Sequence, residues 1–453
     1  MNSIGQTTQL PNYSCSENNV SIQFTLSSSS HSASNPTSSC SLQQCNVSLT
    51  NNNNDNCRSS STPCFDYRTI NNISYCAPGI LCSILETCNN ITQACSSNNS
   101  ICIINSCCSS QAVCLPFLAT YMCKTGWFST GNMGDARYSH TVSALSNGKI
   151  LVTGGSNGSI FYNSAELYDP STGAWSSTNN MTSTRAAHTA SVLSDGKVLV
   201  TGGSVNISPL NNAELYDPLT GIWTTTTNMT NARYSHTASV LSNGKVLVAG
   251  GHNSNYLNSA ELYDLLTGTW TTTGSMTDAR FDHTASLLLD GKVLVTGGLG
   301  NGSFALNSAE LYDPSTGTWT ATNNMNNARF EHTASVLSNG KVLVTGGSNN
   351  DAELYDSSTG TWTNTANMNN ARYQHTASVL LNGKVLVAGG NYGNGTVLNS
   401  AELYDPSTNT WTTTSNMNIA RVYHIASVLS NGKVLVIGGS NNSFSALNSA
   451  ELY

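Results

Sequence analysis

Histidine and arginine recur together along the C-terminal three quarters of the chain, in a motif that reads R-x-x-H. Imidazole is a common metal ligand, so a ring of such histidines could suggest a metal site. However, ligands of one ion must lie about 2 Å from it, and equivalent side chains of separate repeats should lie too far apart to share one. We therefore predict that no metal is bound and that each histidine hydrogen-bonds backbone at the start of a strand. The histidines are His140, His188, His236, His283, His332, His375 and His424.

A glutamate also recurs once per unit, in the segment "AELY". A buried charge is costly unless it is paired, and the arginine of R-x-x-H occurs equally often. We therefore predict an Arg–Glu ion pair in each unit. The glutamates are Glu166, Glu214, Glu261, Glu310, Glu353, Glu402 and Glu451, and the arginines are Arg137, Arg185, Arg233, Arg280, Arg329, Arg372 and Arg421.

The elements that position these residues repeat with them. The arginines are spaced by 48, 48, 47, 49, 43 and 49 residues, and seven tryptophans follow the same spacing. Each unit offers four candidate strands, typified by "HTASVL", "KVLVTGG", "SAELYD" and "WTTT". The turn "SNG" suits a tight hairpin, and "PSTGT" is a turn built on Pro and Gly. Four short antiparallel strands per unit, repeated in this way, predict an all-β propeller.

The two ends of the repeat region predict how the ring closes. The region begins with a fourth strand, "GWFST" around Trp127, and stops at Tyr453, at the end of a third strand. Seven first, second and third strands and seven fourth strands make seven blades. We therefore expect a closed seven-bladed propeller over 125–453, whose last blade is completed by the strand around Trp127, so that no sheet edge is left exposed.

Paired glycines after each second strand, with a Tyr and a Trp separated by six residues, resemble the Kelch repeat. The pair Tyr168 and Trp175 is one example. The resemblance covers all of 125–453, and only turn residues depart from it: Leu265 and Leu266 replace "PS", and Asn409 replaces a glycine. We expect the glycines to allow close backbone approach between blades, and Tyr and Trp to fill the space between sheets. The paired glycines are Gly154, Gly155, Gly202, Gly203, Gly250, Gly251, Gly297, Gly298, Gly346, Gly347, Gly389, Gly390, Gly438 and Gly439.

Two enzyme families share features with this repeat. Copper-radical oxidases of the galactose-oxidase type also use a seven-bladed Kelch propeller, but they need a Cys cross-linked to a Tyr and a His ligand from a following domain. No Cys follows Cys123, and no domain follows the propeller in this chain. The sialidase Asp-box has one residue between Asp and Gly, whereas "DPSTG" has three. With no Ser/His/Asp or Cys/His set in view, we predict a protein that is not an enzyme and uses no cofactor; an oxidase relative without its metal site is the alternative.

All 14 cysteines lie in residues 1–124, a polar segment whose stretch 27–62 is low in complexity. It contains no C-x-x-C and only one histidine, His31, which favours a disulfide framework over zinc. Sequons occur there and in the repeats, so we expect a glycosylated, extracellular protein. The start of the chain does not resemble a signal peptide, and we therefore expect either an upstream start or a fragment. An intracellular Kelch adaptor is the alternative; the clustered cysteines and the lack of a BTB-like or F-box-like segment argue against it.

Charge and hydropathy narrow the range of partners. The net charge of −7 gives no basic footprint for nucleic acid. No stretch reaches the roughly 18 apolar residues that a membrane-spanning helix needs. We therefore predict a protein or carbohydrate partner, no nucleic acid and no transmembrane segment.

Residues that differ between blades are the candidates for specificity, because residues shared by all seven serve the scaffold. The second variable position of R-x-x-H places acidic and polar residues in blades four to seven, where an arc of them could receive a basic peptide or sugar hydroxyls. The variable loops between second and third strands add aromatic residues. The candidate binding residues are Asp282, Glu331, Gln374 and Tyr423 in the arc, and Tyr256, Phe304 and Tyr392 in the loops.

Overall fold

The computed structural model describes residues 126–453 except 348, 394 and 442–444, and before them the backbone of six short strands. The chain divides into two compact units, Met1–Thr125 and Gly126–Tyr453. In the first unit the strands form three antiparallel pairs, β1 (Ser21–Phe24) with β2 (Cys40–Gln43), β3 (Cys64–Arg68) with β4 (Ser74–Pro78), and β5 (Ser100–Ile103) with β6 (Val113–Pro116). The cysteine side chains and the sequons of this unit, on which the disulfide and glycan predictions rest, lie outside the described residues.

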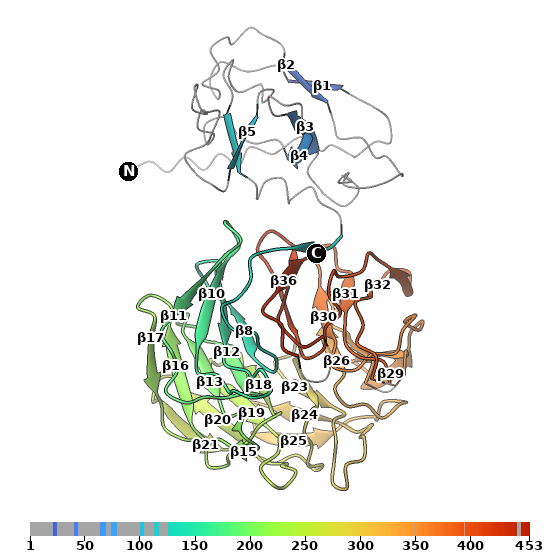
Figure 1. The fold of residues 1–453 in the computed structure, drawn as a ribbon. Coiled ribbons are helices and arrows are strands. Elements are labelled where there is room, and N and C mark those ends of the chain that lie inside the picture. Colours follow the sequence, from blue (N-terminus) through green and yellow to red (C-terminus); the bar gives the residue numbers. More distant parts are fainter. Residues whose placement is uncertain are drawn as a thin grey trace, which may run out of the picture. The chain divides into compact units, whose positions relative to one another are not determined.

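The second unit consists of seven four-stranded antiparallel sheets, which confirms the predicted propeller (Figure 1). The inner strands are β8 (Thr141–Ala144), β12 (Thr189–Val192), β18 (Thr237–Val240), β22 (Thr284–Leu287), β26 (Thr333–Val336), β30 (Thr376–Val379) and β34 (Ile425–Val428). The second strands are β9 (Ile150–Thr153), β13 (Val198–Thr201), β19 (Val246–Ala249), β23 (Val293–Thr296), β27 (Val342–Thr345), β31 (Val385–Ala388) and β35 (Val434–Ile437). A small extra hairpin, β14 (Ser204–Val205) with β15 (Ser208–Pro209), occupies one loop.

The outer half of each sheet holds the two remaining strands. The third strands are β10 (Ala165–Asp169), β16 (Ala213–Asp217), β20 (Ala260–Asp264), β24 (Ala309–Asp313), β28 (Ala352–Asp356), β32 (Ala401–Asp405) and β36 (Ala450–Leu452). The fourth strands are β11 (Ala174–Thr178), β17 (Ile222–Thr225), β21 (Thr269–Thr272), β25 (Thr318–Ala321), β29 (Thr361–Asn364), β33 (Thr410–Thr413) and, for the last blade, β7 (Phe128–Ser129).

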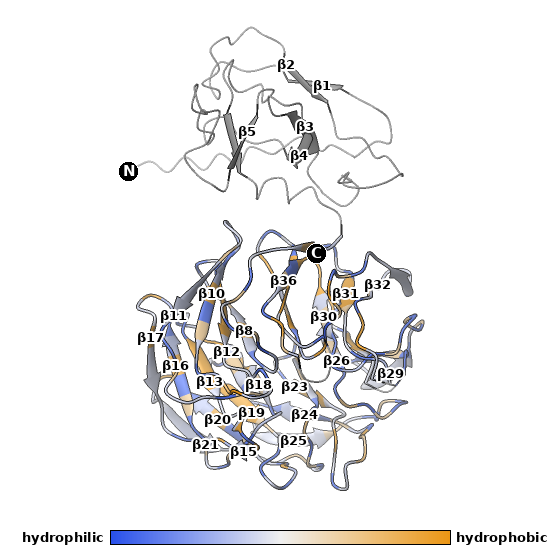
Figure 2. Cartoon of the chain, in the orientation of Figure 1, coloured by the Kyte–Doolittle hydropathy of each residue, from blue (hydrophilic) through white to orange (hydrophobic). Residues whose placement is uncertain are grey.

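Burial follows this order of strands. Every residue of a second strand such as β19 is buried, because neighbouring blades cover both of its faces, and Figure 2 shows these strands as largely hydrophobic. The fourth strands are mostly exposed, which explains their threonine-rich sequence. The core therefore lies between neighbouring blades: Leu145 and Leu151 of the first blade pack with Val198, Val200 and Tyr216 of the second.

The last blade closes the ring as the sequence predicts. Its strand order is β34-β35-β36-β7, and Glu451 and Leu452 of β36 pair with Ser129 and Phe128 of β7. The last blade, red in Figure 1, thus lies beside the first. A strand from the beginning of the repeat region therefore holds its end, so that the last blade, like the others, is a complete four-stranded sheet.

The paired glycines have two distinct roles. A Cβ on Gly250, at φ 66°, would lie 2.6 Å from the carbonyl oxygen of Arg280 in the next blade. A Cβ on Gly251, at φ 95°, would lie 2.7 Å from the carbonyl oxygen of Tyr234 in its own blade. The predicted close approach between blades is confirmed for the first glycine of a pair, and the second serves packing within the blade.

The Tyr and Trp that recur in each blade also have the predicted packing role. Tyr263 is buried in the cluster between the second and third blades, and its ring lies 5.1 Å from that of Trp270. In the next blade, the Trp319 indole N–H donates to the carbonyl oxygen of Gly274 at 2.8 Å. Such aromatic pairs bury large apolar areas; the indole N–H of Trp270 itself is buried without a hydrogen-bond partner.

The predicted Arg–Glu pairs are present in all seven blades. In the third blade, an Nη2 of Arg233 lies 2.8 Å from Oε1 of Glu261, and both side chains are fully buried. The other Arg233 terminal nitrogen donates to the carbonyl oxygens of Gly250 and Ser259. Glu261 also accepts the amide of Thr230 at 2.7 Å, so the pair fixes the segment that leads into the inner strand.

The histidines bridge neighbouring blades through side chains, which corrects part of the prediction. Nε2 of His188 lies 2.9 Å from the hydroxyl of Thr141 and 3.2 Å from that of Thr153, both in the preceding blade. A backbone interaction of the predicted kind contributes to the pKa only at His236 and His424. Burial lowers the pKa of His236 to about 3, so the ring is neutral and acts as a hydrogen-bonding partner.

His140, at the junction of the last and first blades, lacks these threonines. Ile425 and Ile437 occupy the places that Thr141 and Thr153 occupy in the first blade. Both ring nitrogens of His140 are buried without a hydrogen-bond partner. The substitution "IASV" for "TASV" in the last blade therefore leaves a polar ring unsatisfied at the closing interface.

Replacing His140 with leucine is expected to raise the free energy of unfolding by about 1 kcal/mol, because an unsatisfied buried polar group is removed. The matched change His188→Leu is expected to lower it by a similar amount, because the ring hydrogen bonds to two threonines are lost. Urea unfolding followed by tryptophan fluorescence measures both. Equal destabilisation by the two variants would contradict this account.

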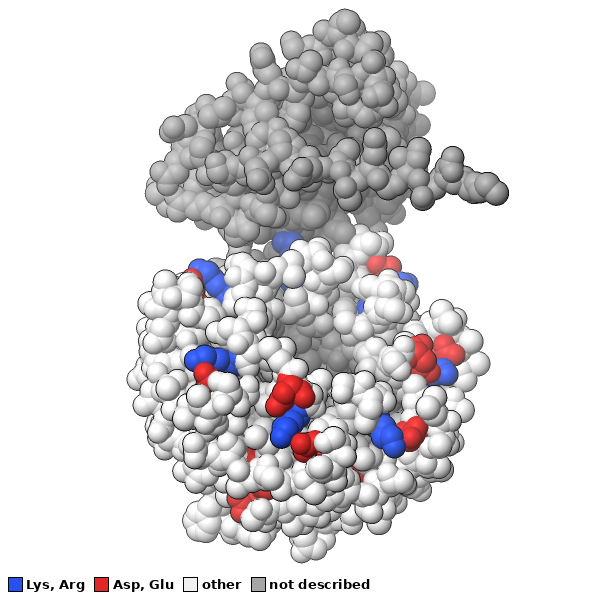
Figure 3. Space-filling model, turned by 180° about the vertical axis from the view of Figure 1, so that it is seen from behind, with Lys and Arg blue, Asp and Glu red and all other residues white. Residues whose placement is uncertain are grey.

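The turns at the far ends of the inner strands carry paired charges. Lysines of the turns between first and second strands lie 3.0 to 3.6 Å from aspartates that end the third strands, in five blades. In Figure 3, charged side chains on one side of the propeller lie in adjacent blue and red pairs. In the last blade Lys433 instead lies over the ring of Phe128, 4.7 Å from its centroid. This end of the inner strands thus has mutually compensated charges.

The described part of the chain includes no helix long and apolar enough to cross a membrane.

Candidate binding site at the mouth of the inner-strand ring

The residue before each inner-strand histidine adopts a left-handed conformation. These residues have φ between 49° and 54° and none is glycine, which is unusual for L-amino acids; they are Ser139, Ala187, Ser235, Asp282, Glu331, Gln374 and Tyr423. Six of their amides donate to the carbonyl oxygen of the equivalent residue in the preceding blade. The distances run from 2.9 Å, for Ala187 to Ser139, to 3.4 Å, for Ser139 to Tyr423. A circle of backbone hydrogen bonds therefore holds these residues around the start of the inner strands.

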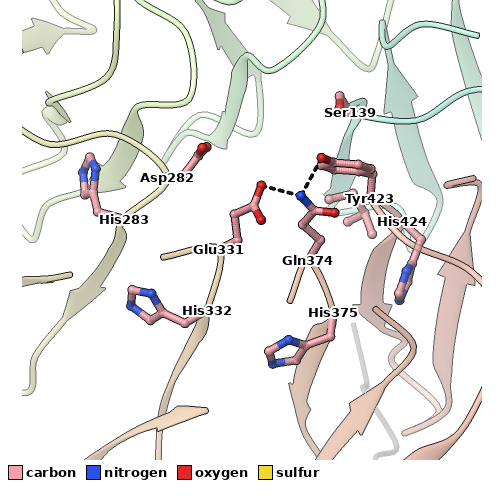
Figure 4. A pocket seen from close by; sticks show the side chains of 10 residues that line it. Ser139, Asp282, His283, Glu331, His332, Gln374, His375, Tyr423 and His424 are labelled. Atoms are coloured by element: carbon pink, nitrogen blue, oxygen red, sulfur yellow. Dashed lines mark hydrogen bonds between the residues drawn. The ribbon is translucent and has the colours of Figure 1, made fainter. Parts of the chain in front are cut away.

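Because the circle fixes their backbone, the side chains of these residues gather at one place. Asp282, Glu331, Gln374, Tyr423 and Ser139 line a cavity of about 240 Å³, with the buried histidines that follow them. We call this cavity the mouth pocket. All four residues of the predicted arc therefore line one pocket, contributed by four successive blades (Figure 4).

Hydrogen bonds link three of the four residues. The Gln374 side-chain nitrogen donates to the Glu331 carboxylate and to the Tyr423 hydroxyl oxygen, as the dashed lines in Figure 4 show. The side-chain oxygen of Gln374 is buried and has no hydrogen-bond partner. Asp282 has a side-chain hydrogen bond with Ser235. The pocket thus offers two carboxylates as acceptors.

Desolvation changes the acidity of the pocket. Burial raises the pKa of Asp282 to about 6 and that of Glu331 to about 7, where repulsion by Asp282 adds to the effect although the Gln374 hydrogen bond opposes it. Burial also raises the pKa of Tyr423 to about 12, with a contribution from Glu331. The two carboxyl groups therefore titrate close to neutral pH.

A buried glutamate with a cation beside it behaves differently. Burial also acts to raise the pKa of Glu402, but hydrogen bonds from Arg372 and from backbone amides outweigh it and the pKa is lowered. In contrast, none of the ion pairs found in the described part of the chain includes Asp282 or Glu331. The missing cation, rather than burial alone, distinguishes the acids of the mouth pocket.

The three loop residues of the prediction do not line the mouth pocket. Tyr256 packs its ring 5.3 Å from His252 and 5.4 Å from Phe281, and its hydroxyl lies 2.7 Å from that of Ser303. Phe304 is 73% exposed, and Tyr392 is 46% exposed. Tyr392 lines a separate polar cavity of about 360 Å³. These three residues therefore do not belong to the mouth pocket.

Sequence reasoning missed two parts of the site. Ser139 lines the pocket from the first blade, and Ser235 bonds Asp282; both occupy the same variable position as the predicted arc, so that position alone could have indicated them. The ring of Tyr373 lies 5.5 Å from that of Phe330, and the ring of Tyr138 lies 6.1 Å from that of Tyr423. Phe330, Tyr373 and Tyr138 occupy the first variable position of R-x-x-H, and Tyr423 occupies the second; of the four, Tyr423 lines the pocket.

The described residues do not fit a copper site of the galactose-oxidase kind. They contain no group of three or more His, Cys, Asp or Glu that could hold a metal ion, and the propeller sequence has no cysteine to cross-link with a tyrosine. Nε2 of six inner-strand histidines is turned to threonines of the preceding blade. No chemical step through copper is therefore derived for this chain.

Comparisons with known proteins agree with the fold. A family model described as the KLHDC2/KLHL20/DRC7 Kelch-repeats domain matches residues 222–370 and 282–452, and one described as the Kelch motif matches 137–182 and 185–230. A sequence comparison with curated proteins gave no match.

Among solved structures, a fungal alcohol oxidase of the AA5 family, in complex with copper, is similar at a TM-score of 0.62 and 20% sequence identity. The match covers 72% of this chain and 76% of the oxidase chain, and at this identity the likeness concerns the fold. The family models together span more than two thirds of the chain, and with the seven closed blades they show that this protein belongs to the Kelch-repeat family.

Proposed function

We propose that this protein is a non-enzymatic binding module that holds a protein partner at the mouth pocket and the loops around it. The observation that carries the proposal is the pair of desolvated carboxylates, Asp282 and Glu331, which have no cation of their own in a rigid scaffold. Elsewhere in the described propeller, buried glutamates are paired with arginine. Asp282 and Glu331 are partly exposed, and a partly desolvated charge without a counter-charge still costs the fold; functional sites are where such costs are found.

The rest of the pocket supports binding rather than catalysis. Its polar groups are hydrogen-bond acceptors and a tyrosine whose pKa is raised, and the neighbouring histidines are neutral and buried. None of these is an activated nucleophile with a base beside it. Variable residues on a rigid ring of strands are the usual arrangement for recognition.

The proposed setting is extracellular. The 14 cysteines crowded into residues 1–124, the cysteine-free propeller and the sequons in both parts of the chain support it. In an oxidising compartment such a cysteine-rich segment can be cross-linked, while the propeller needs no disulfide because its ring is closed by strand pairing.

Affinity capture tests the proposed function. The full chain and a variant with Asp282, Glu331, Gln374 and Tyr423 replaced by serine would be used to capture proteins and glycans from extracellular material of the source organism. The control variant replaces Asn243, Asn339, Asn382 and Asn431, in the turns at the opposite ends of the inner strands, with serine. We expect a protein that the parent and the control variant hold and the mouth variant loses.

Three outcomes would overturn the proposal. Equal capture by the mouth variant and the parent would place the site elsewhere. A captured glycan that depends on the four residues would contradict the protein class. Absence of any capture by the parent would contradict a binding function. Circular dichroism of each variant separates loss of binding from loss of fold.

A further inference from the structure

We propose that the mouth pocket receives a basic side chain of the partner, with its guanidinium or ammonium group between Asp282 and Glu331. This inference rests on the proposed function and specifies the chemistry of the partner. The lining of the pocket offers two carboxylates as acceptors, with the hydroxyls of Ser139 and Tyr423 beside them, and it includes no Lys or Arg. Such a set is matched by a ligand that carries several N–H donors and a positive charge.

Hydrogen bonding within the pocket leaves the acids available. The Gln374 side-chain nitrogen donates to Glu331 and to Tyr423. In this orientation the side-chain oxygen of Gln374 is buried and accepts no hydrogen bond. A guanidinium has five N–H donors in one plane, so it can bond a carboxylate through two of them at once. The internal hydrogen bonds alone do not neutralise either acid.

The size of the pocket favours a side chain over a whole small molecule. Sites for small molecules usually enclose about 300–1,000 Å³, whereas the mouth pocket encloses about 240 Å³. Tyr423 lines the pocket, and an aromatic ring is a surface on which a planar cation can stack. An arginine inserted from a protein surface fits these limits.

The charged neighbours of the two acids do not substitute for a bound cation. His283, His332, His375 and His424 are buried. Burial lowers the pKa of His332 and His375 to about 3 and lowers the pKa of His283 and His424 well below the ordinary value, so all four are neutral. Arg280 and Arg329 are bonded to Glu310 and Glu353. The acids in turn raise the pKa of Tyr234 and Tyr373, after burial, which keeps these tyrosines neutral as well.

Cation binding should therefore displace protons. A cation favours the ionised carboxylates, and because the pKa of Asp282 is about 6 and that of Glu331 about 7, both acids are largely ionised only above pH 7. Affinity for a cation should rise with pH between 5.5 and 8, by at least about tenfold. Binding at pH 6.5 should release protons, since the complex holds fewer than the free protein.

The test uses a matched pair of probes, N-acetyl-arginine amide and its uncharged analogue N-acetyl-citrulline amide. Ligand-observed NMR with the full chain would measure the affinity of each at pH 5.5 and pH 8. We expect the arginine probe to bind at least about tenfold more tightly than the citrulline probe at pH 8. The variant Glu331→Gln should reduce binding of the arginine probe at least about tenfold.

Asp290→Asn is the control for net charge. It removes one negative charge from an exposed turn away from the pocket, and asparagine already occupies this position in five other blades, at Asn147, Asn243, Asn339, Asn382 and Asn431. We expect this variant to bind the arginine probe as the parent does.

Equal binding of the two probes at pH 8, or no detectable binding of the arginine probe, would overturn the inference. The proposed function would be judged separately: a partner that the parent captures and the mouth variant loses would still support a binding module, with a different ligand chemistry. If the arginine probe is not preferred and the mouth variant also captures what the parent captures, both the inference and the proposed function are refuted.

Discussion

Replacing Glu261 with glutamine is expected to lower the free energy of unfolding by about 3–5 kcal/mol, because it leaves the charge of Arg233 buried and unpaired. Arg233 and Glu261 are both fully buried, with their charged atoms 2.8 Å apart. The carboxylate also accepts the amides of Thr230 and Asn231, at 2.7 and 3.0 Å. A glutamine amide group can replace only one of its two oxygens, so one of these donors loses its acceptor as well.

Urea unfolding followed by tryptophan fluorescence measures this effect, since all seven tryptophans belong to the repeats. The double variant Arg233→Met with Glu261→Leu should cost much less than the sum of the single changes, because no charge remains buried. A loss below about 1 kcal/mol for Glu261→Gln would show that the pair behaves as a surface ion pair and would contradict its assigned role.

Replacing Glu331 with glutamine is expected to raise the free energy of unfolding, in contrast to the change at Glu261, and the size of the increase should depend on pH. The folded-state pKa of Glu331, about 7, is above its ordinary value of 4.5. Between these values the folded state binds the proton more tightly than the unfolded chain, so the parent loses stability as pH rises from about 4.5 to about 7. Glutamine carries no such charge, and the variant should therefore be more stable than the parent above pH 7.

The difference should be close to zero at pH 4, where the carboxyl is protonated in both states, and about 2 kcal/mol at pH 8. This figure is smaller than the full pKa change implies, since solvent screening reduces the cost of a partly exposed charge. Thermal or urea unfolding at both pH values measures it, with Asp290→Asn as the control for net charge. A constant difference across the pH range would show that Glu331 is not desolvated in the folded protein.

Together the two predictions separate scaffold from site. Both glutamates lie in the same propeller. Glu261 is fully buried and Glu331 is partly exposed, and only Glu261 has a cation of its own. Removing the paired acid should destabilise the protein, whereas removing the unpaired acid should stabilise it. Such a residue weakens the fold, and its retention is explained if a partner supplies the missing charge.

Most of the fold was predictable from the sequence because its signals are local and repeated. Seven four-stranded sheets can be derived from the apolar runs of the second strands and from the "SNG" turns. Their closure follows from the last blade, which has only three strands before Tyr453. The Arg–Glu pairs were predictable from equal occurrence and the cost of a buried charge. Asn409, where most blades have glycine, keeps the same left-handed turn at φ 54°.

The site was predictable only in part. Variation between blades indicated Asp282, Glu331, Gln374 and Tyr423, and the structure brings these four together. The left-handed conformation at this position was not predictable, because it is imposed by hydrogen bonds between blades and does not depend on glycine. The raised pKa values also depend on neighbours from other blades, and no local pattern reports them. The unsatisfied His140, by contrast, could have been found from Ile425 and Ile437.

The most direct measurement of the central claim is hydrogen exchange of the full chain with and without the captured partner. If the mouth pocket is the binding site, the partner should slow amide exchange in 280–284, 329–333, 372–376 and 421–425, where the four inner strands of the pocket begin. The turns at the opposite ends of these strands, 289–291, 338–340, 381–383 and 430–432, should exchange at the same rate in both states. Protection confined to those turns, or to residues 1–124, would contradict the assignment of the mouth pocket as the binding site.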